Sequence, residues 1–148
     1  MTTSTSNDRT WVALRIALAC AALWTLMGAI PGYLDPEGSF ARFFGAPADS
    51  PLVLELYRGA WGQTLLFAIG YGVASFDPRR HALVVVLGVT GKLLYAIRIF
   101  ASLAERPPTP LALTAAIGDL VFVATFATLT FLVWSRGRRT NVVSSAAA

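Results

Sequence analysis

Six residues with a charged or hydroxyl side chain lie inside stretches that are otherwise strongly apolar. They are Glu55, Arg58, Lys92, Tyr95, Arg98 and Asp119. Acids and bases in such surroundings can pair with one another, relay a proton or bind a polar ligand. An ionised side chain at the centre of a membrane-spanning helix costs about 2.5–3.5 kcal/mol, so these residues are expected to face one another or a wet cavity. We take them as a candidate cluster, either ligand-binding or structural.

Asp119 is the only acid deep in its apolar stretch, which makes it the natural counter-ion for a neighbouring cation. The helical rise places Asp119 about 5 Å from the membrane midplane, Arg98 about 8 Å from it on the same side, and Lys92 within about 1 Å of it. Depth therefore ranks Arg98 first as the partner of Asp119, with Lys92 close behind. Tyr95 shares a helical face with both cations, and Gly118 allows a close approach of another helix.

Glu55 and Arg58 are three residues apart, so they can pair on one helical face. The whole cluster falls in one half of the membrane and has one positive charge in excess. Three interpretations stay open. The charges set the register of the helices, the excess cation binds an anionic or quinone-like ligand, or Asp119 and Lys92 form part of a proton or ion path.

The elements that position these residues are four apolar segments, at 11–33, 52–75, 82–103 and 111–134. Each exceeds the roughly 20 residues that cross a bilayer as a helix. Hydrophobic residues make up 55% of the 148-residue chain and charged residues only 14%, against about 25% charged residues in soluble domains. The sequence predicts an all-α, four-helix transmembrane bundle with its domain at 11–135.

The flanking arginines predict the orientation of this bundle. Two lie on one side, and the six on the other side are Arg9, Arg79, Arg80, Arg136, Arg138 and Arg139. The positive-inside rule then puts both termini in the cytoplasm. Membrane topology accounts for most of the net charge of +4, so no nucleic acid partner is expected. A signal peptide is the alternative interpretation of the first segment, which is long for one. Residues 1–10 and the basic tail 136–148 are expected to be disordered.

The loop at 34–51 is predicted to be external and to carry a short interfacial helix. Phe40, Phe43 and Phe44 have the spacing of one helical face, and Gly45 follows them as a stop signal. This helix either anchors the loop at the membrane surface or covers a site in the outer half of the bundle.

The remaining reactive side chains do not indicate catalysis. His81 is the only histidine and is predicted at the opposite membrane face from Glu55 and Asp119, so neither a catalytic triad nor a metal site is expected. Cys20 is the only cysteine, which leaves no pair for thiol redox chemistry or a disulfide. Enzymatic activity is therefore not the favoured expectation.

Short motifs resemble small bacterial four-helix membrane proteins of the DoxX-like type. They are YRGAWG at 57–62, DPRRH at 77–81, GK at 91–92 and GD at 118–119. That family takes its name from a membrane subunit of a quinone-linked oxidoreductase. The resemblance implies a bacterial inner-membrane location and an accessory role in redox chemistry. The cofactor stays open, with a quinone as one candidate, and the partners to consider are a second copy of the chain or a larger membrane complex. The leading hypothesis is a non-enzymatic binding or accessory subunit; a quinone-linked oxidoreductase subunit and an oligomeric ion- or proton-coupled carrier are the alternatives.

Overall fold

Prolines and capping side chains divide the chain into five helices. A computed structural model describes residues 3–102 and 107–146, and all regular structure in this part of the chain is helical. The helices are α1 (Thr3–Leu34), α2 (Pro36–Phe44), α3 (Pro51–Phe76), α4 (Ala82–Ser102) and α5 (Pro110–Ala146). The predicted all-α fold class is confirmed.

Local capping explains where the two helices of the first long connection begin and end. Both α2 and α3 have proline in their first turn, where no backbone N–H is needed. The side chain of Asp35 accepts a hydrogen bond from the Gly38 N–H at 3.0 Å, and that of Ser50 accepts one from the Val53 N–H at 3.4 Å. Gly45 ends α2 with a φ of 75°, the left-handed conformation that glycine adopts without strain. The short helix predicted in this loop is confirmed.

The helical ends are longer than the sequence predicts. Disorder is expected at 1–10 and 136–148, but α1 begins at Thr3 and α5 continues to Ala146. No proline lies in 3–10 or 136–146 to stop either helix, and each residue added to an existing helix forms another backbone hydrogen bond. Residues 1–2 and 147–148 lie outside the described part of the chain.

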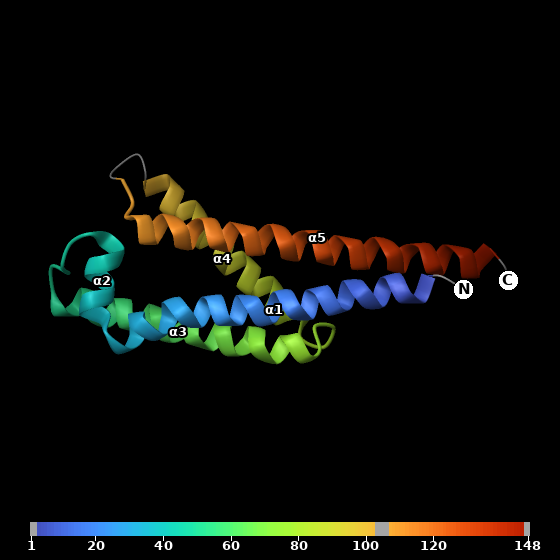
Figure 1. The fold of residues 1–148 in the computed structure, drawn as a ribbon, viewed down its shortest axis with the longest axis horizontal. Coiled ribbons are helices and arrows are strands. Elements are labelled where there is room, and N and C mark those ends of the chain that lie inside the picture. Colours follow the sequence, from blue (N-terminus) through green and yellow to red (C-terminus); the bar gives the residue numbers. More distant parts are fainter. Residues whose placement is uncertain (1–2, 103–106, 147–148) are drawn as a thin grey trace.

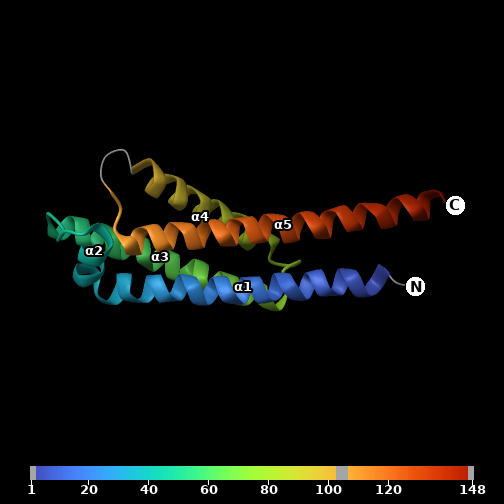
Figure 2. The ribbon, with the colours of Figure 1, turned by 45° about the horizontal axis from the view of Figure 1, so that its top comes forward.

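The four long helices run between two ends of an elongated molecule (Figure 1). α1 and α3 lie against each other and run in opposite directions (Figures 1 and 2). α5 lies on another side of α1, and α4 crosses obliquely between α3 and α5. The first residues of α1 and the last residues of α5 share one end, and α2 lies at the other end. This arrangement places the middle of α4 and α5 in the interior.

Three of the helices contain segments long and apolar enough to cross a membrane. The segments are Asp8–Leu34 in α1, the whole of α4, and Pro110–Val133 in α5. The predicted span 52–75 forms α3, but this helix is not among the three. Charged and polar residues in its first half, including Glu55 and Arg58, lower its apolarity. Residue 103, the last of the predicted third span, lies outside the described residues.

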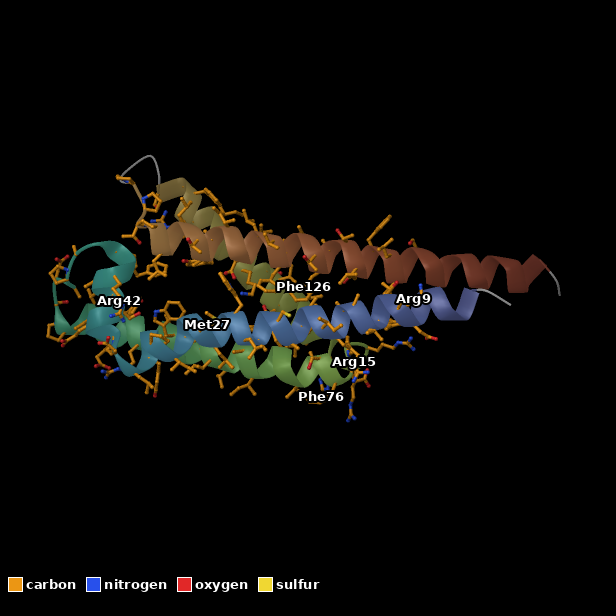
Figure 3. The ribbon with its side chains drawn as sticks, in the orientation of Figure 1. Arg9, Arg15, Met27, Arg42, Phe76 and Phe126 are labelled. Atoms are coloured by element: carbon orange, nitrogen blue, oxygen red, sulfur yellow. The ribbon has the colours of Figure 1, made fainter. Side chains whose placement is uncertain are left out.

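The outer surface of the bundle is apolar, and its core is a small group of tightly buried side chains. Met27 is 72% exposed, and large aliphatic residues are similarly exposed on every long helix. The largest fully buried side chains are Leu18, Tyr71 and Phe126, from α1, α3 and α5. The rings of Tyr71 and Phe126 stack with centroids 6.3 Å apart, and Figure 3 shows Phe126 on the inner side of α5. An apolar exterior around a packed interior suits contact with lipid.

Candidate functional site

A buried ion pair joins α4 to α5 at the centre of the bundle. Lys92 Nζ donates to Asp119 Oδ1 across 2.5 Å. Lys92 is 8% exposed and Asp119 is 9% exposed, so each charge depends on the other for its neutralisation. Asp119 is thus paired with Lys92, and the ranking that put Arg98 first is wrong. Arg98 comes six residues after Lys92, which turns its side chain roughly 120° around the helix from that of Lys92.

Trp24 brings α1 into the same site. Its indole N–H donates to Asp119 Oδ1 at 3.2 Å, so one carboxylate oxygen accepts hydrogen bonds from two helices. The Trp24 ring lies directly on Gly118, where an added Cβ would stand 2.2 Å from Trp24 Cζ2. The glycine expected to allow a close helix approach therefore makes room for an aromatic ring. Three helices meet at Asp119.

Two aromatic rings lie near the ammonium group of Lys92. Lys92 Nζ lies 5.8 Å from the centroid of the Tyr71 ring and 5.6 Å from that of Phe122. At these distances the faces of aromatic rings attract a cation. Gly88, one turn before Lys92, permits the position of Tyr71, because an added Cβ there would meet the Tyr71 hydroxyl oxygen at 2.1 Å. The Lys92 side chain is consequently held in place by α3 and α5 as well as by its own helix.

Two hydroxyl groups on the helices that form the site are buried without a hydrogen-bond partner among the described residues. They are Tyr95 Oη, one turn along α4 from Lys92, and Thr25 Oγ1, next to Trp24 on α1. The Tyr95 hydroxyl lies within electrostatic reach of the Asp119 carboxylate. A buried polar group left without a partner costs about 1–3 kcal/mol. A hydroxyl can donate one hydrogen bond and accept others, so Tyr95 gives the site a group that could bind a polar ligand.

The structure does not bring the other predicted residues to this pair. Arg58 Nη1 bonds to Glu55 Oε1 at 2.9 Å, as their spacing predicts, but the two side chains are 42% and 64% exposed and form a separate pair near the start of α3. Arg98 is exposed and has no ion-pair or hydrogen-bond partner among the described residues. The excess positive charge of the predicted cluster therefore belongs to Arg98. The buried Lys92–Asp119 pair is electrically neutral.

α2 covers one end of the helices that carry the pair. Phe43 is buried, and its ring centroid lies 6.2 Å from that of Trp61 in α3 and 6.3 Å from that of Tyr95 in α4. Thr109, at the start of α5, donates from Oγ1 to the Phe43 carbonyl oxygen at 2.7 Å. The phenylalanine face of α2 thus packs on the bundle and lies over the Tyr95 end of the site.

The chain matches no protein-family model, no curated protein and no solved structure. The chemistry of the site follows from its own geometry. No group of three or more histidine, cysteine, aspartate or glutamate side chains that could hold a metal ion occurs in the described part of the chain. The groups assembled around Asp119 are hydrogen-bond donors, hydroxyls and aromatic faces, a set suited to binding.

Sequence reasoning missed the contributions of Trp24, Thr25, Tyr71 and Phe122 to the site. A signal for Trp24 was present. It lies in the middle of an apolar segment, whereas tryptophans of membrane proteins concentrate at the interfaces, and an indole N–H in an apolar interior requires an acceptor. Thr25, Tyr71 and Phe122 carry no comparable signal, because helical spacing alone does not reveal which face of a uniformly apolar helix points inward.

Proposed function

We propose that the protein is a small integral membrane protein with four spans and both termini in the cytoplasm. Three helices of sufficient length and apolarity support this topology, together with the position of α3 against α1. The shared end of α1 and α5 agrees with an even number of crossings (Figure 1). The excess of flanking arginines at that end assigns it to the cytoplasm. The inner-membrane part of this proposal rests on the resemblance of its short motifs to bacterial DoxX-like proteins.

Within that membrane, its proposed role is that of a non-enzymatic binding or accessory subunit, in a homo-oligomer or a larger complex. The observation that carries this proposal is the buried Tyr95 hydroxyl, which has no hydrogen-bond partner among the described residues and lies one turn along α4 from the neutral Lys92–Asp119 pair. Because the pair is already neutral, the site favours an uncharged ligand over an anion. A ligand with a carbonyl oxygen would accept a hydrogen bond from the Tyr95 hydroxyl and lie against the neighbouring rings.

A quinone-like molecule has this chemistry, with two carbonyl acceptors on a flat apolar ring. The second candidate function, a membrane subunit of a quinone-linked oxidoreductase, rests on the same ligand class and on the DoxX-like resemblance. In that case electron transfer involves a partner protein, because this chain contains only one cysteine, Cys20. Native mass spectrometry of the detergent-purified protein would report the subunit count and any retained quinone.

The decisive experiment is titration of the purified protein with a short-chain ubiquinone by calorimetry. Tyr95→Phe removes one unpartnered hydroxyl, so binding should weaken about fivefold to tenfold, the equivalent of one hydrogen bond, while the melting temperature stays the same or rises. The matched control is Tyr33→Phe, which removes the hydroxyl of a tyrosine on α1 that is 43% exposed. It should leave both the stability and ubiquinone binding unchanged. Equal binding by wild type and Tyr95→Phe, or no binding by either protein, would contradict the proposed ligand.

A further inference from the structure

A second polar site lies at the end of the bundle shared by the start of α1 and the turn between α3 and α4. It is an open groove of about 280 Å³. The lining residues are Asp8, Trp11, Val12, Arg15, Pro78 and Arg79. Trp11 and Trp24 are 13 residues apart on α1, so this groove lies about 20 Å from the Lys92–Asp119 pair. Its volume is slightly below the range of roughly 300–1,000 Å³ for drug-sized ligands, which suits a group the size of a lipid headgroup.

Two arginine side chains are held at this groove by contacts that leave most of their N–H groups available. Among the described residues, Arg15 donates only from Nε, to the Ser75 carbonyl oxygen at 2.9 Å, and this bond ties α1 to the end of α3 (Figure 3). The Arg79 guanidinium lies over the Trp11 ring at 4.3 Å from the ring centroid. Guanidinium groups fixed by one edge or one face can present their remaining N–H groups together to a single oxyanion.

The local backbone holds Arg79 in position beside the groove. Asp77 Oδ1 accepts hydrogen bonds from the backbone N–H groups of Arg79 at 3.2 Å and of Arg80 at 3.3 Å. The turn between α3 and α4 is thereby fixed, with one arginine lining the groove and the next one outside it. Asp8 is the one acid in the lining, so the two arginines leave it with a net positive charge.

The wall of the groove also contains a donor that lacks an acceptor. Trp11 Nε1 is buried and has no hydrogen-bond partner among the described residues. An indole nitrogen can only donate, so an acceptor oxygen is the only group that satisfies it. The Arg15 and Arg79 guanidinium groups and the Trp11 indole N–H therefore suit the same kind of ligand atom. This atom is an oxygen that accepts hydrogen bonds and, beside the two arginines, carries negative charge.

We propose that this groove binds a phosphate group, namely that of an anionic phospholipid headgroup. A phosphate supplies several charged acceptor oxygens for the Arg15 and Arg79 guanidinium groups. The lipid is the favoured source because Trp11 and Val12 belong to the apolar helix α1, at the level where tryptophan marks the membrane interface. This inference depends on the proposed membrane location but not on the ligand of the Lys92–Asp119 site.

The test is calorimetric titration of the purified full chain with dioctanoyl phosphatidylglycerol, dioctanoyl phosphatidylcholine and inorganic phosphate. Phosphatidylglycerol should bind more tightly than the other two. Arg79→Gln should weaken that binding about tenfold, whereas the matched control Arg80→Gln, which removes the same charge one residue along, should change it less than twofold. Trp11→Phe keeps the ring under Arg79 and removes the N–H, so it should weaken binding about threefold to fivefold.

The variants also separate a defined site from general electrostatic attraction. Arg15→Lys keeps the charge and loses the planar fork of donors, so it should still weaken phosphatidylglycerol binding. Equal losses in Arg79→Gln and Arg80→Gln would overturn the site, and equal binding of phosphatidylcholine would do so as well. Inorganic phosphate binding as tightly as phosphatidylglycerol would overturn the assignment to a lipid. Melting temperatures measured on each variant confirm that all of them are folded when they are titrated.

Discussion

Removing the charge of Asp119 should destabilise the protein strongly, because it leaves a buried ammonium group without a counter-ion. Asp119→Asn keeps an oxygen that can accept hydrogen bonds from Trp24 and Lys92, so the change isolates the loss of the negative charge beside the Lys92 ammonium group. Lys92 remains 8% exposed. Breaking a buried ion pair by neutralising one partner typically costs about 3–5 kcal/mol, and we expect a decrease of this size in the free energy of unfolding.

Neutralising both Lys92 and Asp119 should recover much of the unfolding free energy that Asp119→Asn loses. Lys92→Met keeps the length and apolar stem of the side chain without its charge. In the double variant with Asp119→Asn no unpaired charge remains, and replacing a buried ion pair with neutral groups of similar volume is often close to neutral for stability. The expected coupling energy between the two substitutions is about 2–3 kcal/mol, at the upper end of values for directly contacting residues.

The measurement is reversible unfolding of all four proteins in mixed detergent and dodecyl sulfate micelles, followed by tryptophan fluorescence. The free energies of the wild type, the two single variants and the double variant form a complete cycle. Additivity within about 0.5 kcal/mol would refute the argument, because it would mean that Lys92 and Asp119 do not depend on each other for neutralisation.

Two further substitutions test the packing and the outlying charge pair. Gly118→Ala should cost about 1–3 kcal/mol in unfolding free energy, because its Cβ would displace the Trp24 ring. Gly59→Ala is the control, since no atom lies within 4 Å of the added Cβ, and it should leave stability unchanged or slightly higher. Equal effects of the two alanines would show that the ring does not depend on the glycine. Glu55→Gln should change stability by less than about 1 kcal/mol, because its pair with Arg58 is largely exposed; a loss comparable with that of Asp119→Asn would contradict this.

The helix ends beside the connecting segments could be predicted closely, because apolar length, proline and capping residues act locally. The predicted segment 52–75 differs by one residue at each end from α3, Pro51–Phe76. The same local signals placed the short helix α2 and its end at Gly45. Depth along a helix could also be estimated, since the rise per residue is constant.

The side of each helix that faces inward could not be predicted from such signals. Depth alone favours Arg98 over Lys92, but only Lys92 lies on the face of α4 that meets α5. α1, α3 and α5 are apolar around most of their circumference, so their sequences do not mark an inner face. Trp24 and Tyr71 reach the site because glycines on neighbouring helices leave space for their rings, and complementarity of this kind depends on the tertiary arrangement.

With the proposed membrane topology, the ion pair between α4 and α5 has a consequence for the biogenesis of the protein. A nascent α4 entering lipid alone would carry the unpaired ammonium of Lys92, and α5 alone would carry the carboxylate of Asp119, each at a cost of about 2.5–3.5 kcal/mol. Only a short connection separates Ser102 from Pro110, so the two helices can leave the insertion machinery as one hairpin with their charges already joined. α4 would then wait at the translocon until α5 has been synthesised, and a ribosome stalled before Asp119 would leave α4 unable to partition fully into the bilayer.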